Sequence, residues 1–147
     1  MTIDKSADLR INSRRDKLYL NELGSFSGDS YFSNINGGIV NNEMNFVSRY
    51  GAINLDNIRK TLSSLNLTAE YTKVTLSFEK STSYNLELTL HQEVMLIYPK
   101  NLALLKTKVV DVAEKQFLTT GIIGNEPAFS NVVIRVPKKC NLTLISK

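Results

Sequence analysis

Apolar and polar residues alternate along much of this chain. The alternation is clearest over residues 84–90, 132–136 and 140–144, where every second residue is apolar. Successive side chains of a β-strand point to opposite faces of the sheet, so this period predicts strands with one buried face.

A short phrase recurs along the chain. Residues 13–20 match residues 48–55 and residues 69–76, and further copies stand at residues 28–35 and, more weakly, at residues 93–96. Each copy begins with a turn residue. Two apolar positions that alternate with other residues follow, and a third apolar position lies past a short bend. We expect these apolar positions to form one buried wall of Leu18, Leu20, Leu23, Phe32, Ile35, Ile53, Leu55, Ile58, Val74, Leu76 and Phe78. Ser30 departs from the pattern at a position that should face inward.

The repeat predicts the fold class. Units this small cannot bury their own apolar edge, so neighbouring units must stack and complete the core. We therefore expect an all-β fold, a parallel β-helix (solenoid) with irregular coils, in which Ile53 lies beside Val74 on the next winding. An antiparallel β-sandwich built from the same strands is the alternative. One short helix is expected around Leu102 to Leu105, after Pro99.

Composition narrows the class of protein. The chain has 147 residues, enough for one domain, with 42% hydrophobic and 22% charged residues, as in an ordinary globular protein. A net charge of +4, spread along the chain, does not indicate a nucleic-acid partner. No apolar run is long enough for a membrane span. A single cysteine excludes an intrachain disulfide framework.

Candidate catalytic groups are sparse. A histidine-dependent triad or a zinc site needs several His and Cys residues, and this chain has one of each, so we expect no cofactor and no metal. His91 should face water, and Cys140 should be a buried, inert thiol. A carbohydrate-cleaving β-helix needs at least two acids together. Only one acid occurs among the predicted outward positions, which are Tyr19, Asn21, Tyr31, Ser33, Asn54, Asp56, Thr75 and Ser77. The chain is therefore predicted not to be an enzyme.

Three residues share one position of the repeat. Arg15, Tyr50 and Tyr71 would stack as an exposed ladder if their windings are adjacent. Such a ladder could bind a sugar ring, which makes these residues the candidate ligand-binding site. The alternative is a ladder that only stiffens the bend.

The phrase Ser48-Arg49-Tyr50-Gly51-Ala52-Ile53-Asn54-Leu55-Asp56-Asn57-Ile58, with its echoes, resembles a bacterial adhesin family of unknown function, the toast-rack or head-domain type. Residues 118–124, 132–136 and 140–144 also look like the closing coils of that family. The first copy departs from the phrase, because Arg15-Asp16 stands where Tyr-Gly is expected.

The resemblance implies a right-handed, single-stranded parallel β-helix (solenoid) in an exported or envelope-associated bacterial protein. We expect residues 1–147 to form a single solenoid domain, the C-terminal part of a longer exported protein. The expected function is a non-catalytic structural or adhesin-like module, with a carbohydrate-binding or carbohydrate-cleaving β-helix as the alternative. Its expected partners are a cell-surface glycan or an envelope protein, and a second copy joined through the solenoid ends.

Overall fold

The computed structural model describes residues 2–79, 82–99, 103–113, 115–124 and 130–146 of the chain. Within these ranges the secondary structure is all β, without a helix. The strands are β1 (Thr2–Arg14), β2 (Lys17–Tyr31), β3 (Asn34–Ile58), β4 (Ser64–Phe78), β5 (Tyr84–His91), β6 (Met95–Ile97), β7 (Ala103–Asp111), β8 (Gln116–Ile123), β9 (Ser130–Val136) and β10 (Asn141–Ser146).

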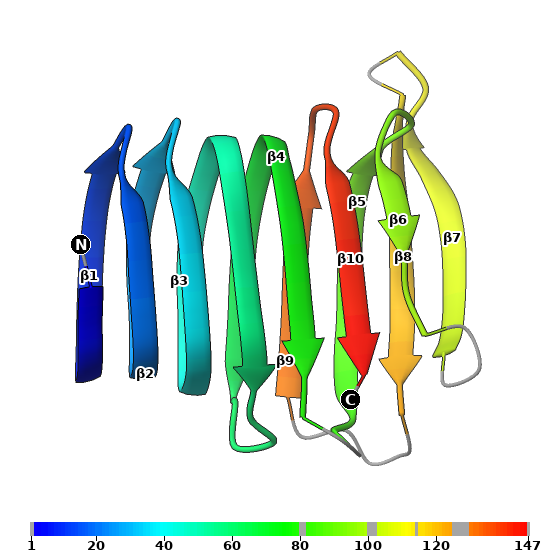
Figure 1. Cartoon of the computed structure of the whole chain (residues 1–147). Coiled ribbons are helices and arrows are strands. Elements are labelled where there is room, and N and C mark those ends of the chain that lie inside the picture. Colours follow the sequence, from blue (N-terminus) through cyan, green and yellow to red (C-terminus); the bar gives the residue numbers. More distant parts are fainter. Residues whose placement is uncertain (1, 80–81, 100–102, 114, 125–129, 147) are drawn as a thin grey trace.

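These strands form one mostly parallel sheet. Its order is β1-β2-β3-β4-β9-β5-β8-β7, and β10 pairs with β4 and with β6. The pairs that involve β8 are antiparallel, whereas the other pairs are parallel. In Figure 1 the strands stand side by side in two layers, and the narrow bends after β1 and β2 lie at the top.

β3 and β4 pair in the register that the repeat predicts. Ile53 lies beside Val74 and Leu55 beside Leu76 in a parallel ladder between β3 and β4. All four side chains are buried. The prediction that these residues share one interior is therefore confirmed.

The copy at residues 28–35 is aligned differently from the prediction. Ser30, rather than Gly28, pairs with Ser48, so Phe32 takes the position of Tyr50 at the bend. Phe32 is 48% exposed, and the prediction that it points inward is wrong. Ser30 is buried, but as part of the bend rather than of the apolar wall. The error arose because alternation alone does not decide which of the two adjacent aromatic residues follows the bend.

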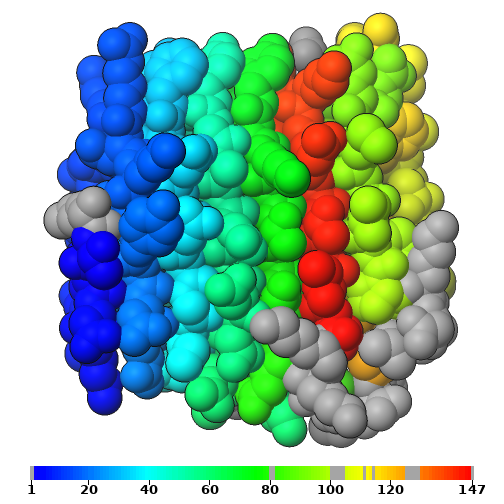
Figure 2. Space-filling view, in the orientation of Figure 1, coloured from blue at the N-terminus to red at the C-terminus, as the bar shows by residue number. Residues whose placement is uncertain are grey.

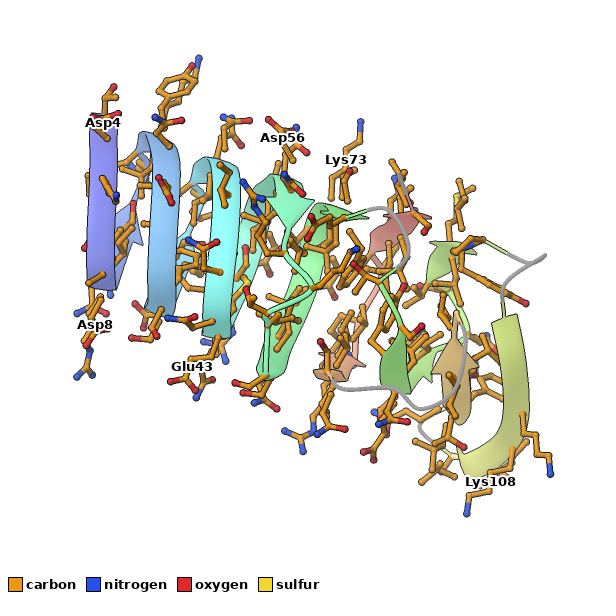
Figure 3. The ribbon with its side chains drawn as sticks, turned by 90° about the horizontal axis from the view of Figure 1, so that it is seen from below. Asp4, Asp8, Glu43, Asp56, Lys73 and Lys108 are labelled. Atoms are coloured by element: carbon orange, nitrogen blue, oxygen red, sulfur yellow. The ribbon has the colours of Figure 1, made fainter. Side chains whose placement is uncertain are left out.

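Apolar side chains from both layers fill the interior. Leu18 pairs with Ile35 on one layer, and Phe26 pairs with Met44 on the other. Phe26 also stacks on Phe46, with ring centroids 4.8 Å apart. Charged side chains point away from both layers, as Figure 3 shows for Asp4, Asp8, Glu43, Asp56, Lys73 and Lys108. The alternation in the sequence thus separates the core from the surface.

The strands nearest the C-terminus lie between strands from earlier in the chain. β9 pairs with β4 on one side and with β5 on the other, and β10 lies between β4 and β6. Leu142 consequently contacts Val74 on one side and Leu96 on the other. Figure 1 shows β9 and β10, in orange and red, among the green strands. Residues 132–136 and 140–144 therefore do not form the last strands of the sheet, whereas the resemblance led us to expect them at its end.

The far end of the sheet is antiparallel. β8 pairs with β5 and with β7, which is the last strand in the sheet order. The helix expected around Leu102 to Leu105 is wrong for residues 103–105, which begin β7; Leu102 lies outside the described residues. The reason is that residues 103–111 pair with β8, and this tertiary pairing overrides a weak local preference.

Candidate functional site

Four residues with unusual backbone conformation line up at the bends between the two layers. We call them the aromatic corner: Arg15 (φ 55°), Phe32 (φ 53°), Tyr50 (φ 54°) and Tyr71 (φ 50°). The N–H of Arg15 donates to the carbonyl of Tyr31, and the N–H of Phe32 donates to the carbonyl of Arg49. These bonds join the first three bends, and the pairing of Arg49 with Glu70 and of Gly51 with Thr72 places the bend of Tyr71 beside that of Tyr50, so the four positions form one column.

The left-handed conformation is costly for residues other than glycine. For an L-residue it costs roughly 1–2 kcal/mol, because Cβ approaches the following carbonyl oxygen. Glycine would avoid this cost, yet three of the four corner positions hold large aromatic residues. Strain of this kind clusters at binding and catalytic sites, where the surrounding structure maintains it. The corner is therefore the strongest candidate site in the described part of the chain.

The corner side chains form a continuous stack. Tyr50 and Tyr71 lie almost parallel, with ring centroids 5.1 Å apart and 9° between their planes. Phe32 stacks on the other side of Tyr50 at 5.0 Å and 21°. The Arg15 guanidinium carbon lies 6.0 Å from the centroid of Phe32. Tyr31 stands edge-on to both Phe32 and Tyr50.

The structure brings the three predicted ligand-binding residues into this one column. Tyr50 and Tyr71 contact each other directly, whereas Phe32 separates Arg15 from Tyr50. Sequence reasoning missed Phe32 and the edge-on Tyr31. An alignment on the serine that precedes each bend, Ser30 with Ser48, would have found both residues.

A column of buried hydroxyl groups lies beneath the corner. Ser30 Oγ donates to Ser48 Oγ at 3.3 Å, and Ser48 Oγ lies 3.4 Å from Thr72 Oγ1. Ser13 Oγ is 3.0 Å from Ser33 Oγ. These side chains are buried, so their mutual hydrogen bonds offset the loss of water. The hydroxyl column thereby helps to hold the strained bends in place.

Two hollows flank the corner. The larger, about 940 Å³, lies beside the ends of β1 and β2 and is lined by residues that include Arg14, Asp29, Tyr31 and Arg49. The smaller, about 350 Å³, adjoins the other end of the stack at Tyr71. The aromatic corner thus lies between two hollows.

The other predicted outward positions are only partly as expected. Tyr19, Asn54 and Asp56 are exposed, whereas Ser33 and Ser77 are buried. The displaced alignment explains Ser33, because it lies directly after the bend and bonds inward to Ser13.

The single cysteine adjoins the bend of Tyr71, and the single histidine lies at the end of β5. His91 is partly exposed at the end of β5, and its Nδ1 accepts a hydrogen bond from the N–H of Glu93 at 3.1 Å. Cys140 is buried, as predicted, and accepts a bond from the N–H of Thr72 at 3.3 Å. Burial raises the pKa of this thiol, which keeps it protonated.

Among the described residues no three His, Cys, Asp or Glu side chains gather where a metal ion could bind. None of the described segments forms a helix that could cross a membrane. Comparisons with protein-family models, with curated proteins and with solved structures found no match to this chain.

Proposed function

We propose that this chain is a non-catalytic, adhesin-like module of the bacterial cell envelope, whose β-solenoid scaffold presents the aromatic corner to a cell-surface glycan. The scaffold part of the proposal is supported by the parallel register from β1 through β4 and by the apolar rows inside it. Each strand leads into the next through a bend, and parallel neighbours joined in this way wind in a right-handed sense.

The solenoid and the alternative antiparallel sandwich predict different neighbours for the same residue. Asn54 lies beside Thr75 in the parallel ladder. Neighbouring strands are about 4.8 Å apart, a separation that a disulfide can bridge. In a Cys140→Ser background, Asn54→Cys with Thr75→Cys should form a disulfide under mild oxidation. Asn36→Cys with Thr75→Cys is the matched control, because Asn36 pairs with Tyr19 on the earlier winding. Cross-linking of the control pair alone would refute the solenoid.

The observation that carries the binding proposal is the column of strained aromatic residues. Stacked rings on adjacent windings are rigid and lose little conformational freedom when a ligand binds. Apolar ring faces next to polar hollows suit a sugar, which has both C–H faces and hydroxyl groups. The hydroxyl column below the corner fixes the bends in advance of binding.

A glycan array tests the binding proposal. The wild-type chain should bind a subset of surface polysaccharides, and Tyr50→Ala combined with Tyr71→Ala should weaken that binding by at least tenfold. Loss of one stacking platform costs roughly 1–3 kcal/mol. Tyr19→Ala is the control, because Tyr19 is 51% exposed on β2 but lies outside the stack. Equal binding by wild type, double variant and control would remove the corner as the glycan site.

A further inference from the structure

The two ends of the aromatic stack differ. At the Phe32 end the Arg15 guanidinium covers the ring. At the other end Tyr71 stacks on Tyr50, its second face has no aromatic or cation–π partner among the described residues, and its side chain is 47% exposed. The hollow of about 350 Å³ adjoins Tyr71 and extends to the winding that contains β10. Tyr71 therefore offers the ring face at which a ligand can extend the stack.

We call this hollow the Tyr71 pocket. Its lining includes Tyr71, Thr72 and Lys73 from β4, Gly51 from β3, and Lys139 and Asn141 from the next winding. A Cβ on Gly51 would overlap the carbonyl oxygen of Ser33, so this position of the wall accepts only glycine. The pocket combines one aromatic ring with polar groups.

The charges at the pocket have one sign. Lys73 and Lys139 contribute two ammonium groups, from adjacent windings. Figure 3 shows the Lys73 side chain pointing away from the ribbon. In the space-filling view of Figure 2 the windings of β4 and β10 lie against each other on the visible face. Lysines from these windings can consequently approach one ligand together.

Glu70, the acidic residue next to Tyr71, forms an ion pair with Arg49. Glu70 precedes Tyr71, and its charge contributes to the raised pKa of the neighbouring Cys140. Its carboxylate lies 3.3 Å from the Arg49 guanidinium, on the other side of the bend. The two lysines therefore define the charge of the Tyr71 pocket, which favours an anion.

We propose that the Tyr71 pocket binds a carboxylated sugar, a uronic acid residue of an acidic polysaccharide. The apolar face of the pyranose ring would stack on the open face of Tyr71. Its carboxylate would lie between Lys73 and Lys139, and the Asn141 amide would bind ring hydroxyls. This inference rests on the proposed glycan-binding function and names the class of sugar.

A matched pair of ligands tests whether binding depends on the carboxylate of the sugar. Trigalacturonate and its methyl ester share every ring face and hydroxyl and differ in charge. Binding of each to the full chain is measured by isothermal titration calorimetry at low and at moderate salt. We expect wild type to bind the acid at least tenfold more tightly than the ester. Added salt should reduce this preference, because exposed charges are screened.

Substitutions of the two lysines then show which side chains bind the carboxylate. Lys73→Gln or Lys139→Gln alone should weaken binding of the acid by about threefold, and the double variant by about tenfold, since a single solvent-exposed ion pair contributes little. Binding of the ester should not change. Lys138→Gln is the control, because Lys138 precedes Lys139 but does not line the pocket. Tyr71→Ala should weaken both ligands.

The outcomes separate the two proposals. Equal binding of acid and ester, or an unchanged double lysine variant, overturns the acidic-sugar inference and leaves glycan binding at the corner intact. Binding of other glycans on the array without binding of trigalacturonate also overturns the inference. Absence of binding on the array as well as in the titration refutes both proposals.

Discussion

The most direct test of the packing concerns the hydroxyl group of Tyr84. This side chain begins β5, is 1% exposed, and stacks on Phe78 with ring centroids 4.2 Å apart. Its hydroxyl oxygen has no hydrogen-bond partner among the described residues. A polar group that is buried without a partner costs about 1–3 kcal/mol. The ring therefore stabilises the core while the hydroxyl group destabilises it.

Tyr84→Phe removes the oxygen and keeps the ring. We expect the free energy of unfolding to rise by about 1 kcal/mol and the midpoint of thermal unfolding by about 2–4 °C. Urea and thermal unfolding followed by circular dichroism measure both quantities. Tyr19→Phe is the control, because the Tyr19 side chain is exposed and should tolerate the change. A loss of about 1 kcal/mol in Tyr84→Phe would mean that the hydroxyl group is hydrogen-bonded, and would refute the reasoning.

The same substitution has a pH signature. Burial raises the pKa of Tyr84 far above its ordinary value near 10. Above about pH 10 the unfolded chain loses this proton and the folded chain keeps it, so the folded state binds more protons and its stability falls. This term removes up to about 1.4 kcal/mol per pH unit from the wild type and is absent in Tyr84→Phe. The advantage of the variant should therefore grow from pH 9 to pH 11, and a constant difference would contradict a buried, protonated hydroxyl.

The remaining predictions concern two glycines and the thiol. Gly28→Ala should cost at least about 2 kcal/mol, because Gly28 has φ 132° and a Cβ would overlap the backbone carbonyl of Ile11. Gly37→Ala should cost only about 1 kcal/mol in the same urea assay, since its Cβ would meet Leu55 Cδ2 at 2.5 Å and that side-chain tip can rotate. Equal losses of stability in the two variants would contradict the distinction between a backbone clash and a side-chain clash. Cys140 should react with a thiol reagent at pH 8 only as fast as the chain unfolds, and rapid labelling of the folded protein would contradict its burial.

Much of the strand structure follows from local patterns. Alternation of apolar and polar residues identifies the strands, and the repeated phrase places Ile53 beside Val74, as observed. The same repeat places Arg15, Tyr50 and Tyr71 at one position, and the structure joins Tyr50 to Tyr71 in a stack. These features depend on short segments that recur, so they can be recognised from the sequence.

The full set of residues in the aromatic corner could not be predicted from the sequence. Adjacent aromatic residues at Tyr31 and Phe32 fit the alternation in two ways, and only the pairing of Ser30 with Ser48 decides between them. The left-handed conformation of Phe32 could not be predicted either, because it is unfavourable for an isolated residue and depends on the hydrogen bonds around the bend. The Tyr71 pocket depends on Lys139, which is distant in sequence from Tyr71.

What the sequence determined by itself was therefore the class of structure, an all-β fold whose strands bury one apolar face. Tertiary structure alone decided the order of the strands. β9 and β10 pair with β4, β5 and β6 rather than following β8 at the end of the stack. The physical reason is that alternation specifies which face of a strand is buried, whereas the choice of neighbour depends on the free energy of burying that face against every other edge in the folded chain.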